Sequence, residues 1–250
     1  LVPSKGNAVI RTADQEGVII AGVMVDAGLE ESKVLIQVGE PNSKSDHRDN
    51  PISLHDIYVR VGGALAGTAK NCLEINSNHV IGDHFWLWRA DHGTGADWNI
   101  NKSEHGLIVN GDDVTIYGLF NEHYQNYQTL WNGERGRTYF YQCEIPYELP
   151  SNEVWNDNGK PGFAAYKVAD HVNEHEAWGL GIYSFFRGES AERKNVRLEN
   201  AMEVPDKPDI KIEHIVTFSG RVGGINNVIN GKGPKTEKGK YAQFDGWNVE

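Results

Sequence analysis

Acidic residues recur at equivalent points of the sequence, each at the end of an apolar run typical of a β-strand. Aligning these runs predicts one column of equivalent positions, formed by Asp26, Gly62, Asp91, Glu122 and Glu144. Two carboxyl groups can hydrolyse a glycosidic bond, because one protonates the leaving oxygen while the other activates water or attacks the sugar. Stacked strands lie roughly 4.8 Å apart, which would place Asp26 and Asp91 about 9.6 Å apart across Gly62, at the edge of the inverting range. The column therefore indicates acid/base chemistry on a sugar.

A second acidic group lies in the loop of residues 45–51, just before the strand expected to stack next to Asp26. Asp46 and Asp49 could project their carboxylates over the same face. The alternative is a solvated turn that begins at Asn50-Pro51.

Aromatic residues are concentrated near Asp91, and aromatic faces with polar edges suit sugar rings. Trp88, His92 and Glu122 are expected to line the same cleft. Alternation along the strand turns either Trp86 and Trp88 or Leu87 and Arg89 toward the core, and the sequence leaves this choice open.

Metal, nucleotide and serine-hydrolase chemistry find no support in the motifs. His47, His92 and His123 show no spacing typical of a transition-metal site, and no phosphate-binding glycine loop or nucleophile elbow occurs. We therefore expect no required cofactor and no catalytic metal, although turn carboxylates leave room for a structural calcium ion.

The elements that must position these residues are short strands joined by tight turns, as the 28 glycines and many Asn and Asp residues indicate. Steps between the motif positions are 36 (26 to 62), 29 (62 to 91), 31 (91 to 122) and 22 (122 to 144). One strand-rich unit per repeat, with loops of variable length, predicts an all-β fold. The expected architecture is a right-handed parallel β-helix, a solenoid with two or three strands per coil.

The repeat begins within the first ten residues, whereas a solenoid needs a capping element at each end. We therefore expect residues 1–250 to form one catalytic domain, the C-terminal portion of a β-helix that lacks its N-terminal part in this chain.

The composition narrows the class of partner. The formal net charge is −11 and no Lys/Arg cluster occurs, which argues against nucleic acid and favours a neutral polysaccharide. No apolar run is long enough to span a bilayer, so no membrane partner is expected. Cys72 and Cys143 are too few for a disulfide framework, and two buried thiols are favoured over a single bridge.

Several segments resemble the catalytic β-helix of glycoside hydrolase family 87, the bacterial α-1,3-glucanases and mycodextranases. The likeness extends over about residues 9–230. It rests on Val23-Met24-Val25-Asp26-Ala27-Gly28, Asp56-Ile57-Tyr58-Val59-Arg60-Val61-Gly62-Gly63, Trp88-Arg89-Ala90-Asp91-His92-Gly93 and Tyr117-Gly118-Leu119-Phe120-Asn121-Glu122-His123.

This resemblance implies an inverting endo-hydrolase of α-1,3-glucan, secreted by a bacterium into the extracellular space and usually linked to carbohydrate-binding modules. The family uses three aspartates, one of them followed about 23 residues later by an adjacent pair. Asp26 and Asp49 are 23 residues apart (26 to 49), but Asn50 stands where the pair requires a third aspartate.

We accordingly expect Asp26 and Asp49 to be the acid/base carboxylates, with Asp91 assisting and Asp46 contributing to substrate binding. A rival placement sets Asp91 against Asp112-Asp113, at steps of 21 and 22 (91 to 112 and 91 to 113). A relative that has lost activity also fits the missing aspartate.

Two alternatives from other classes stay open. One is a non-catalytic β-helix that binds glycan or acts as a spacer. The other is a β-helical polysaccharide lyase, in which Arg60 or Arg89 would supply the basic group near the acids.

Overall fold

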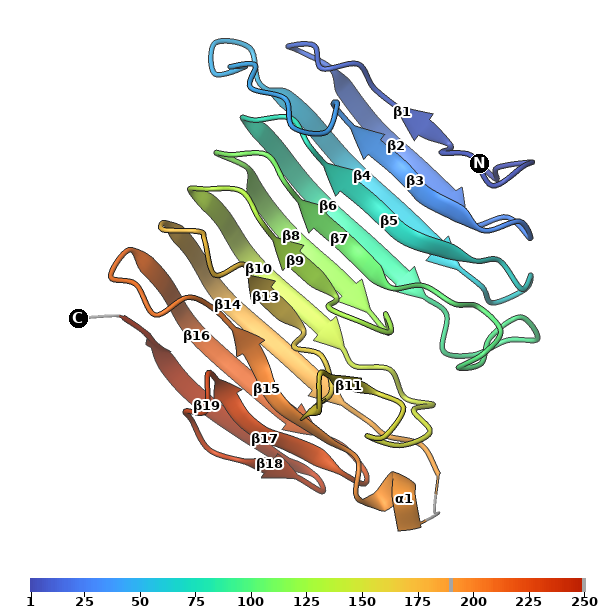
Figure 1. Cartoon of the computed structure of the whole chain (residues 1–250), viewed down its shortest axis with the longest axis vertical. Coiled ribbons are helices and arrows are strands. Elements are labelled where there is room, and N and C mark those ends of the chain that lie inside the picture. Colours follow the sequence, from blue (N-terminus) through green and yellow to red (C-terminus); the bar gives the residue numbers. More distant parts are fainter. Residues whose placement is uncertain (189–190, 249–250) are drawn as a thin grey trace.

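The computed structural model describes residues 1–188 and 191–248, in which the regular elements are β-strands joined by turns and loops, apart from the short helix α1 (Ala191–Lys194). Two long sheets run the length of the molecule and lie against each other (Figure 1). A separate two-stranded ribbon joins β11 (Asn156–Asp157) to β12 (Lys160–Pro161). Within the described ranges, no helix is long and apolar enough to cross a membrane.

The first sheet has nine strands. In spatial order they are β1 (Ile10–Arg11), β3 (Ser32–Val38), β5 (Ala69–Ile75), β7 (His105–Val109), β9 (Thr129–Trp131), β13 (Tyr166–Val168), β15 (Arg197–Glu203), β17 (Gly224–Ile229) and β18 (Thr236–Glu237).

The second sheet has eight strands. In spatial order they are β2 (Ile19–Asp26), β4 (Ile52–Val61), β6 (Val80–Arg89), β8 (Thr115–Glu122), β10 (Gly136–Glu144), β14 (His175–Ser184), β16 (Ile210–Ser219) and β19 (Lys240–Trp247).

The chain alternates between the two sheets, so each pass adds one strand to each of them (Figure 1). Pairing within both sheets is parallel except at the C-terminal edges, where β18 and β19 pair antiparallel with β17 and β16. The predicted all-β class and the parallel stacking of successive repeats are therefore confirmed.

One continuous apolar core fills the space between the sheets. Rows of inward side chains from neighbouring strands stack on each other, as Val25, Val59 and Leu87 do in register. Burying each such side chain contributes ~1.5–3 kcal/mol to the stability of the fold. This burial fixes the register of the strands, because a shift of one residue would move the apolar side chains of a strand from the core to the solvent face. Both Cys72 and Cys143 are buried free thiols in this core.

Each parallel strand of the second sheet contains one residue in the left-handed region at the same level, where the ladder skips a pair. The strands all kink at this level while their pairing stays one-to-one, and each kink restarts the alternation of side chains, so that two consecutive residues point outward. The residues are Gly22, Asp56, His84, Gly118, Phe140, Gly179 and His214.

We expect the kink to make Gly179 costly to replace. Its φ is +70°, and an added Cβ would meet nothing within 4 Å, so substitution isolates the backbone cost. Gly179→Ala should lower the free energy of unfolding by about 1–2 kcal/mol, measured by urea denaturation. Gly179→Asn is the matched control and should cost less, because Asn tolerates this region. Equal stability of the alanine variant and the parent would contradict a backbone cost at this kink.

Candidate functional site

A row of outward side chains crosses the second sheet near the carboxyl ends of its strands. Asp26, Arg60, Trp88 and Glu122 are paired in register on β2, β4, β6 and β8. Glu144 continues the row on β10, where the His123 amide donates to its carbonyl over 2.8 Å. Glu122 and Glu144 therefore project side by side from adjacent strands.

This row corrects the predicted column. Asp26, Glu122 and Glu144 belong to one row, but Arg60 and Trp88 occupy the positions expected for Gly62 and Asp91. The apolar pattern sets the register of each strand, whereas Gly62 and Asp91 lie beyond the ends of β4 and β6. Asp26 and Asp91 thus do not face each other across Gly62.

Asp26 is already engaged in an ion pair. The guanidinium of Arg60 donates to both of its carboxylate oxygens, over 2.6 and 3.1 Å. The charge of Asp26 is therefore balanced by Arg60 on the neighbouring strand, and Arg60 and Trp88 lie between Asp26 and Glu122 in the row.

Asp49 and Asp46 lie at the opposite end of the strands. Asp49 precedes β4, which begins at Ile52, whereas Asp26 pairs with Arg60 eight residues later (52 to 60). At roughly 3.3 Å per residue this interval spans about 26 Å, so Asp26 and Asp49 cannot act on one glycosidic bond. Asp46 pairs with Arg48 and, over 3.0 Å, with His79, which directly precedes β6.

The rival placement meets the same difficulty. Asp112 and Asp113 precede β8, and Arg135 holds Asp113 through two hydrogen bonds of 2.8 and 2.7 Å. Asp91 follows the other end of the neighbouring strand β6. The strand length therefore separates Asp91 from this pair as well.

A cleft of about 630 Å³ opens on the outer face of the sheet beside the two glutamates. Aromatic and carboxyl side chains dominate its lining, a combination that offers both a ring face and a proton to a sugar. The lining residues are Tyr58, His84, Phe85, Trp86, Phe120, Glu122, Gln142, Glu144 and Tyr183.

The two tryptophans of β6 both point outward, which settles the choice that alternation leaves open. Leu87 and Arg89 are the inward pair and are completely buried. Trp86 and Trp88 stack with ring centroids 5.8 Å apart, and Trp88 also lies against His92 at 5.3 Å. Trp86 is part of the cleft lining, and the sequence reasoning singled out only Trp88.

Glu122 is buried, and the indole N–H of Trp86 donates to its Oε2 over 2.9 Å. Burial raises the pKa of Glu122 to about 7, despite the hydrogen bond from Trp86, and the negative charges of Glu144 and Asp91 add to the rise. A carboxyl group that holds a proton near neutral pH is suited to acid catalysis.

Glu144 is the more accessible of the two glutamates, with 30% of its side chain exposed. Its Oε2 accepts a hydrogen bond from the Tyr147 hydroxyl, and its Oε1 accepts one from the Gln142 amide over 3.5 Å. The column included Glu144, but sequence reasoning assigned it no role and missed Tyr147 altogether.

Asp91 lies at the edge of this site rather than in its row. Its Oδ1 is 3.8 Å from Nε2 of His123 and 2.8 Å from Nδ1 of His92. Arg187, 96 residues further along the chain, binds both the carboxylate and the backbone carbonyl of Asp91. The ring of Tyr147 lies 4.9 Å from the same guanidinium.

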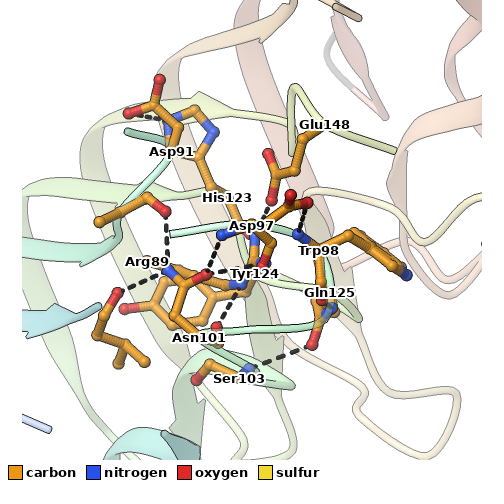
Figure 2. A network of polar contacts seen from close by, with 12 residues as sticks. Arg89, Asp91, Asp97, Trp98, Asn101, Ser103, His123, Tyr124, Gln125 and Glu148 are labelled. Atoms are coloured by element: carbon orange, nitrogen blue, oxygen red, sulfur yellow. Dashed lines mark hydrogen bonds and ion pairs between the residues drawn. The ribbon is translucent and has the colours of Figure 1, made fainter. Parts of the chain in front are cut away.

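A buried arginine supports the turn that carries His123. Arg89 is completely buried and donates to the carbonyls of Asn101, Asp97 and His123 over 2.8, 3.0 and 3.1 Å. Glu148 supplies the opposite charge (Figure 2). Arg89 therefore positions loops from three parts of the chain and is unavailable as a base in a lyase reaction.

No cluster of three or more His, Cys, Asp or Glu side chains able to hold a metal occurs in residues 1–188 and 191–248.

Comparison with known proteins corrects the family suggested by the sequence motifs. The chain is 40% identical over 237 residues to an exo-beta-1,3-glucanase of Streptomyces sp. (strain SirexAA-E / ActE), a match that covers 94% of this chain and 38% of the relative. The likeness to glycoside hydrolase family 87 is therefore wrong, and with it the α-glucan substrate. Parallel strand repeats with Asp/Asn turns and nearby aromatics are not specific to one family.

Two solved structures of sacteLam55A from the same Streptomyces strain share the fold at 38% identity. A glutamate-to-alanine variant in complex with glucose has a TM-score of 0.95, with 98% of this chain and 44% of that chain covered. The second structure has a TM-score of 0.94 and covers 98% and 45%. The chain thus spans less than half the length of these relatives.

The family model of the LAM55 pectate lyase-like domain matches residues 1–144, more than half of the 250 residues. With that match and the 40% identical relative, the chain belongs to the LAM55 pectate lyase-like family.

Proposed function

We propose that the protein containing this chain is a glycoside hydrolase that releases sugars from the end of β-1,3-glucan chains. The observation that carries this proposal is the pair Glu122 and Glu144, side by side in an aromatic cleft, with the pKa of Glu122 raised to about 7. The exo-beta-1,3-glucanase of Streptomyces supplies the linkage and the mode of attack.

Glu144 acts as the general acid. It is the more exposed carboxyl group of the pair, so a glycosidic oxygen can approach it from the cleft. The Oε2 of Glu122 is occupied by the Trp86 indole, which places this residue behind the reacting atoms. The negative charge of Glu144 is one of the causes that raise the pKa of the adjacent Glu122, so a proton is held beside Glu144 near neutral pH. Glu144 then protonates the leaving oxygen as the C1–O bond breaks and water adds to C1, and the proton that this water loses passes to solvent, from which the carboxyl pair is protonated again.

The aromatic lining binds the sugar. Trp86 is 45% exposed and Tyr58 and Tyr183 are each 37% exposed, so ring area is available inside the cleft. Aromatic faces pack on the apolar faces of glucose, while carboxyl and amide groups bind its hydroxyls. The cleft itself carries no Lys or Arg among its lining residues, which matches a neutral glucan.

The wider setting belongs to the same proposal. We infer one catalytic domain over residues 1–250 with a right-handed parallel β-helix, in an extracellular enzyme that degrades polysaccharide outside the cell. Carboxyl groups suffice for this hydrolysis, so the proposal includes no cofactor.

Incubation of the intact protein with β-1,3-, α-1,3- and β-1,4-glucans tests the substrate. We expect soluble glucose or short oligomers from the β-1,3-glucan alone, with little early loss of viscosity because the chains are shortened from their ends. Chromatography of the products and viscometry are the measurements. Binding of β-1,3-glucan without release of sugar would instead indicate a glycan-binding module, and unsaturated products would indicate a lyase.

A further inference from the structure

A second polar layer lies behind Glu144. His123, Asp91 and Arg187 come from the ends of three different strands, β8, β6 and β14, and converge on the end of β10. The Nε2 atom of His123 is 3.4 Å from Oε2 of Glu144 and 3.8 Å from Oδ1 of Asp91. Figure 2 shows the His123 ring pointing toward the Asp91 carboxylate, away from the buried Arg89.

The hydrogen bonds of His123 fix which ring nitrogen carries the hydrogen. Its Nδ1 is 3.3 Å from the carbonyl oxygen of Ile145. A carbonyl only accepts, so Nδ1–H must donate. The neutral ring therefore presents a lone pair at Nε2 toward Glu144 and Asp91.

The ring has little freedom to turn away. Only 2% of the side chain is exposed, and the Tyr147 ring packs against it at 4.5 Å. The backbone of His123 lies in the left-handed region at φ 68°, where its amide bonds Glu144 and its carbonyl accepts from Arg89.

Burial lowers the pKa of His123 to about 4. Asp91 opposes this change, whereas the positive charges of Arg89 and Arg187 reinforce it. The ring is therefore neutral at the pH at which Glu122 titrates. A lone pair at Nε2 repels an ionised carboxylate but accepts a hydrogen bond from a protonated one.

Asp91 adds a fixed negative charge. Burial would raise its pKa, but the hydrogen bond from His92 and the charge and hydrogen bond of Arg187 help to keep the pKa of Asp91 below the usual range. Arg187 prevents the carboxylate from turning away, because it binds both the side chain and the backbone of Asp91. The charge of Asp91 is one of the causes that raise the pKa of Glu122.

We propose that His123 and Asp91, held by Arg187, are positioning residues that keep a proton on the Glu122/Glu144 pair until the glycosidic oxygen accepts it. The lone pair of the neutral His123, 3.4 Å from Glu144, can accept a hydrogen bond from a proton on this carboxyl group, and the charge of Asp91 helps to hold the proton on Glu122. This inference rests on the proposed role of Glu144 as the acid. Neither residue is expected to touch the sugar.

Asp91→Asn and His123→Asn test the proposal in the intact protein. Asparagine at position 123 suits the positive φ and can still donate to the Ile145 carbonyl, but it has no atom in place of Nε2. Both variants should hydrolyse β-1,3-glucan about tenfold more slowly at pH 7. The neutral amide of Asp91→Asn should move the basic limb of the kcat profile about one pH unit lower, because the proton leaves the pair more readily without the charge of Asp91.

A substrate with a good leaving group separates positioning from folding. A 2,4-dinitrophenyl glycoside of a β-1,3-glucan oligomer needs no acid, so both variants should cleave it within about twofold of the parent. Asp83→Asn is the matched control, since Asp83 faces outward on the same strand β6, pairs with His55 over 3.8 Å and does not line the cleft.

Equal losses on both substrates, with the basic limb unmoved, would overturn the proposal and leave His123 and Asp91 with a structural role only. The proposed role of Glu144 as the general acid is tested by a separate variant. If Glu144→Gln fails to recover activity on the dinitrophenyl substrate, Glu144 is not the acid, whatever Asp91→Asn does.

Discussion

Replacing Glu144 by Gln should slow the hydrolysis of β-1,3-glucan by about 10²–10⁴-fold, the contribution typical of a general acid. The amide keeps the size of the side chain and can still accept from Tyr147, but it has no proton to give to the leaving oxygen. Rates measured on β-1,3-glucan and on the dinitrophenyl glycoside should diverge. The second substrate should be cleaved almost as fast as by the parent protein.

Glu213→Gln is the control for this substitution. Glu213 lies on the outer face of the same sheet, on β16, in register with Trp178 rather than with the Glu122/Glu144 row. It should retain full activity on both substrates. Full activity of Glu144→Gln on β-1,3-glucan would remove Glu144 from the mechanism and would count against the cleft as the active site.

Replacing Arg89 by Met should lower the free energy of unfolding by about 3–5 kcal/mol, the range for removing one partner of a buried ion pair. Methionine fills a similar volume, but it leaves the Glu148 carboxylate and the carbonyls of Asn101, Asp97 and His123 without their donor. Urea denaturation measures the change.

Arg48→Met provides the comparison on the surface. Arg48 also pairs with a carboxylate, Asp46, but 67% of its side chain is exposed. Exposed ion pairs contribute about 0–1 kcal/mol, so this variant should be nearly as stable as the parent. If both variants lost a similar free energy of unfolding, burial would not be the reason for the contribution of Arg89 to stability.

The catalytic proposal depends on strand register more than on sequence spacing. Glu122 and Glu144 are 22 residues apart, yet they are neighbours because β8 and β10 pair in parallel register. Asp26 and Asp49 are separated by a similar interval of 23 residues (26 to 49) but lie at opposite ends of a strand. The number of residues between two positions therefore indicates that they are close in space only when both lie at the same end of neighbouring strands in one sheet.

The resemblance to an α-1,3-glucanase family rested on features that many parallel folds share. Segments such as Trp88-Arg89-Ala90-Asp91-His92-Gly93 combine an alternating strand with a polar turn, and the structure gives each part a packing reason. Arg89 is buried in support of loops, and Asp91 is clamped by Arg187. The motif therefore reflects the architecture as much as the substrate.

The sequence by itself determined the repeated parallel strands and most of the acidic row, because both follow from local patterns. Apolar alternation fixes which face of each strand is buried, and turn residues fix where each strand ends. Asp26, Glu122 and Glu144 were placed in one row on that basis, and the structure keeps them there.

Tertiary structure alone decided which carboxyl groups share a cleft. The kinks, at positions occupied by residues as different as Gly118 and Phe140, restart the alternation, and the kink at His84 leaves Trp86 and Trp88 pointing outward. The loops beyond the strands then bring Arg187 onto Asp91 across 96 residues. Neither feature can be read from the periodicity of the sequence, because the kinks occur at residues of very different types and the loop contacts depend on side chains remote in the chain.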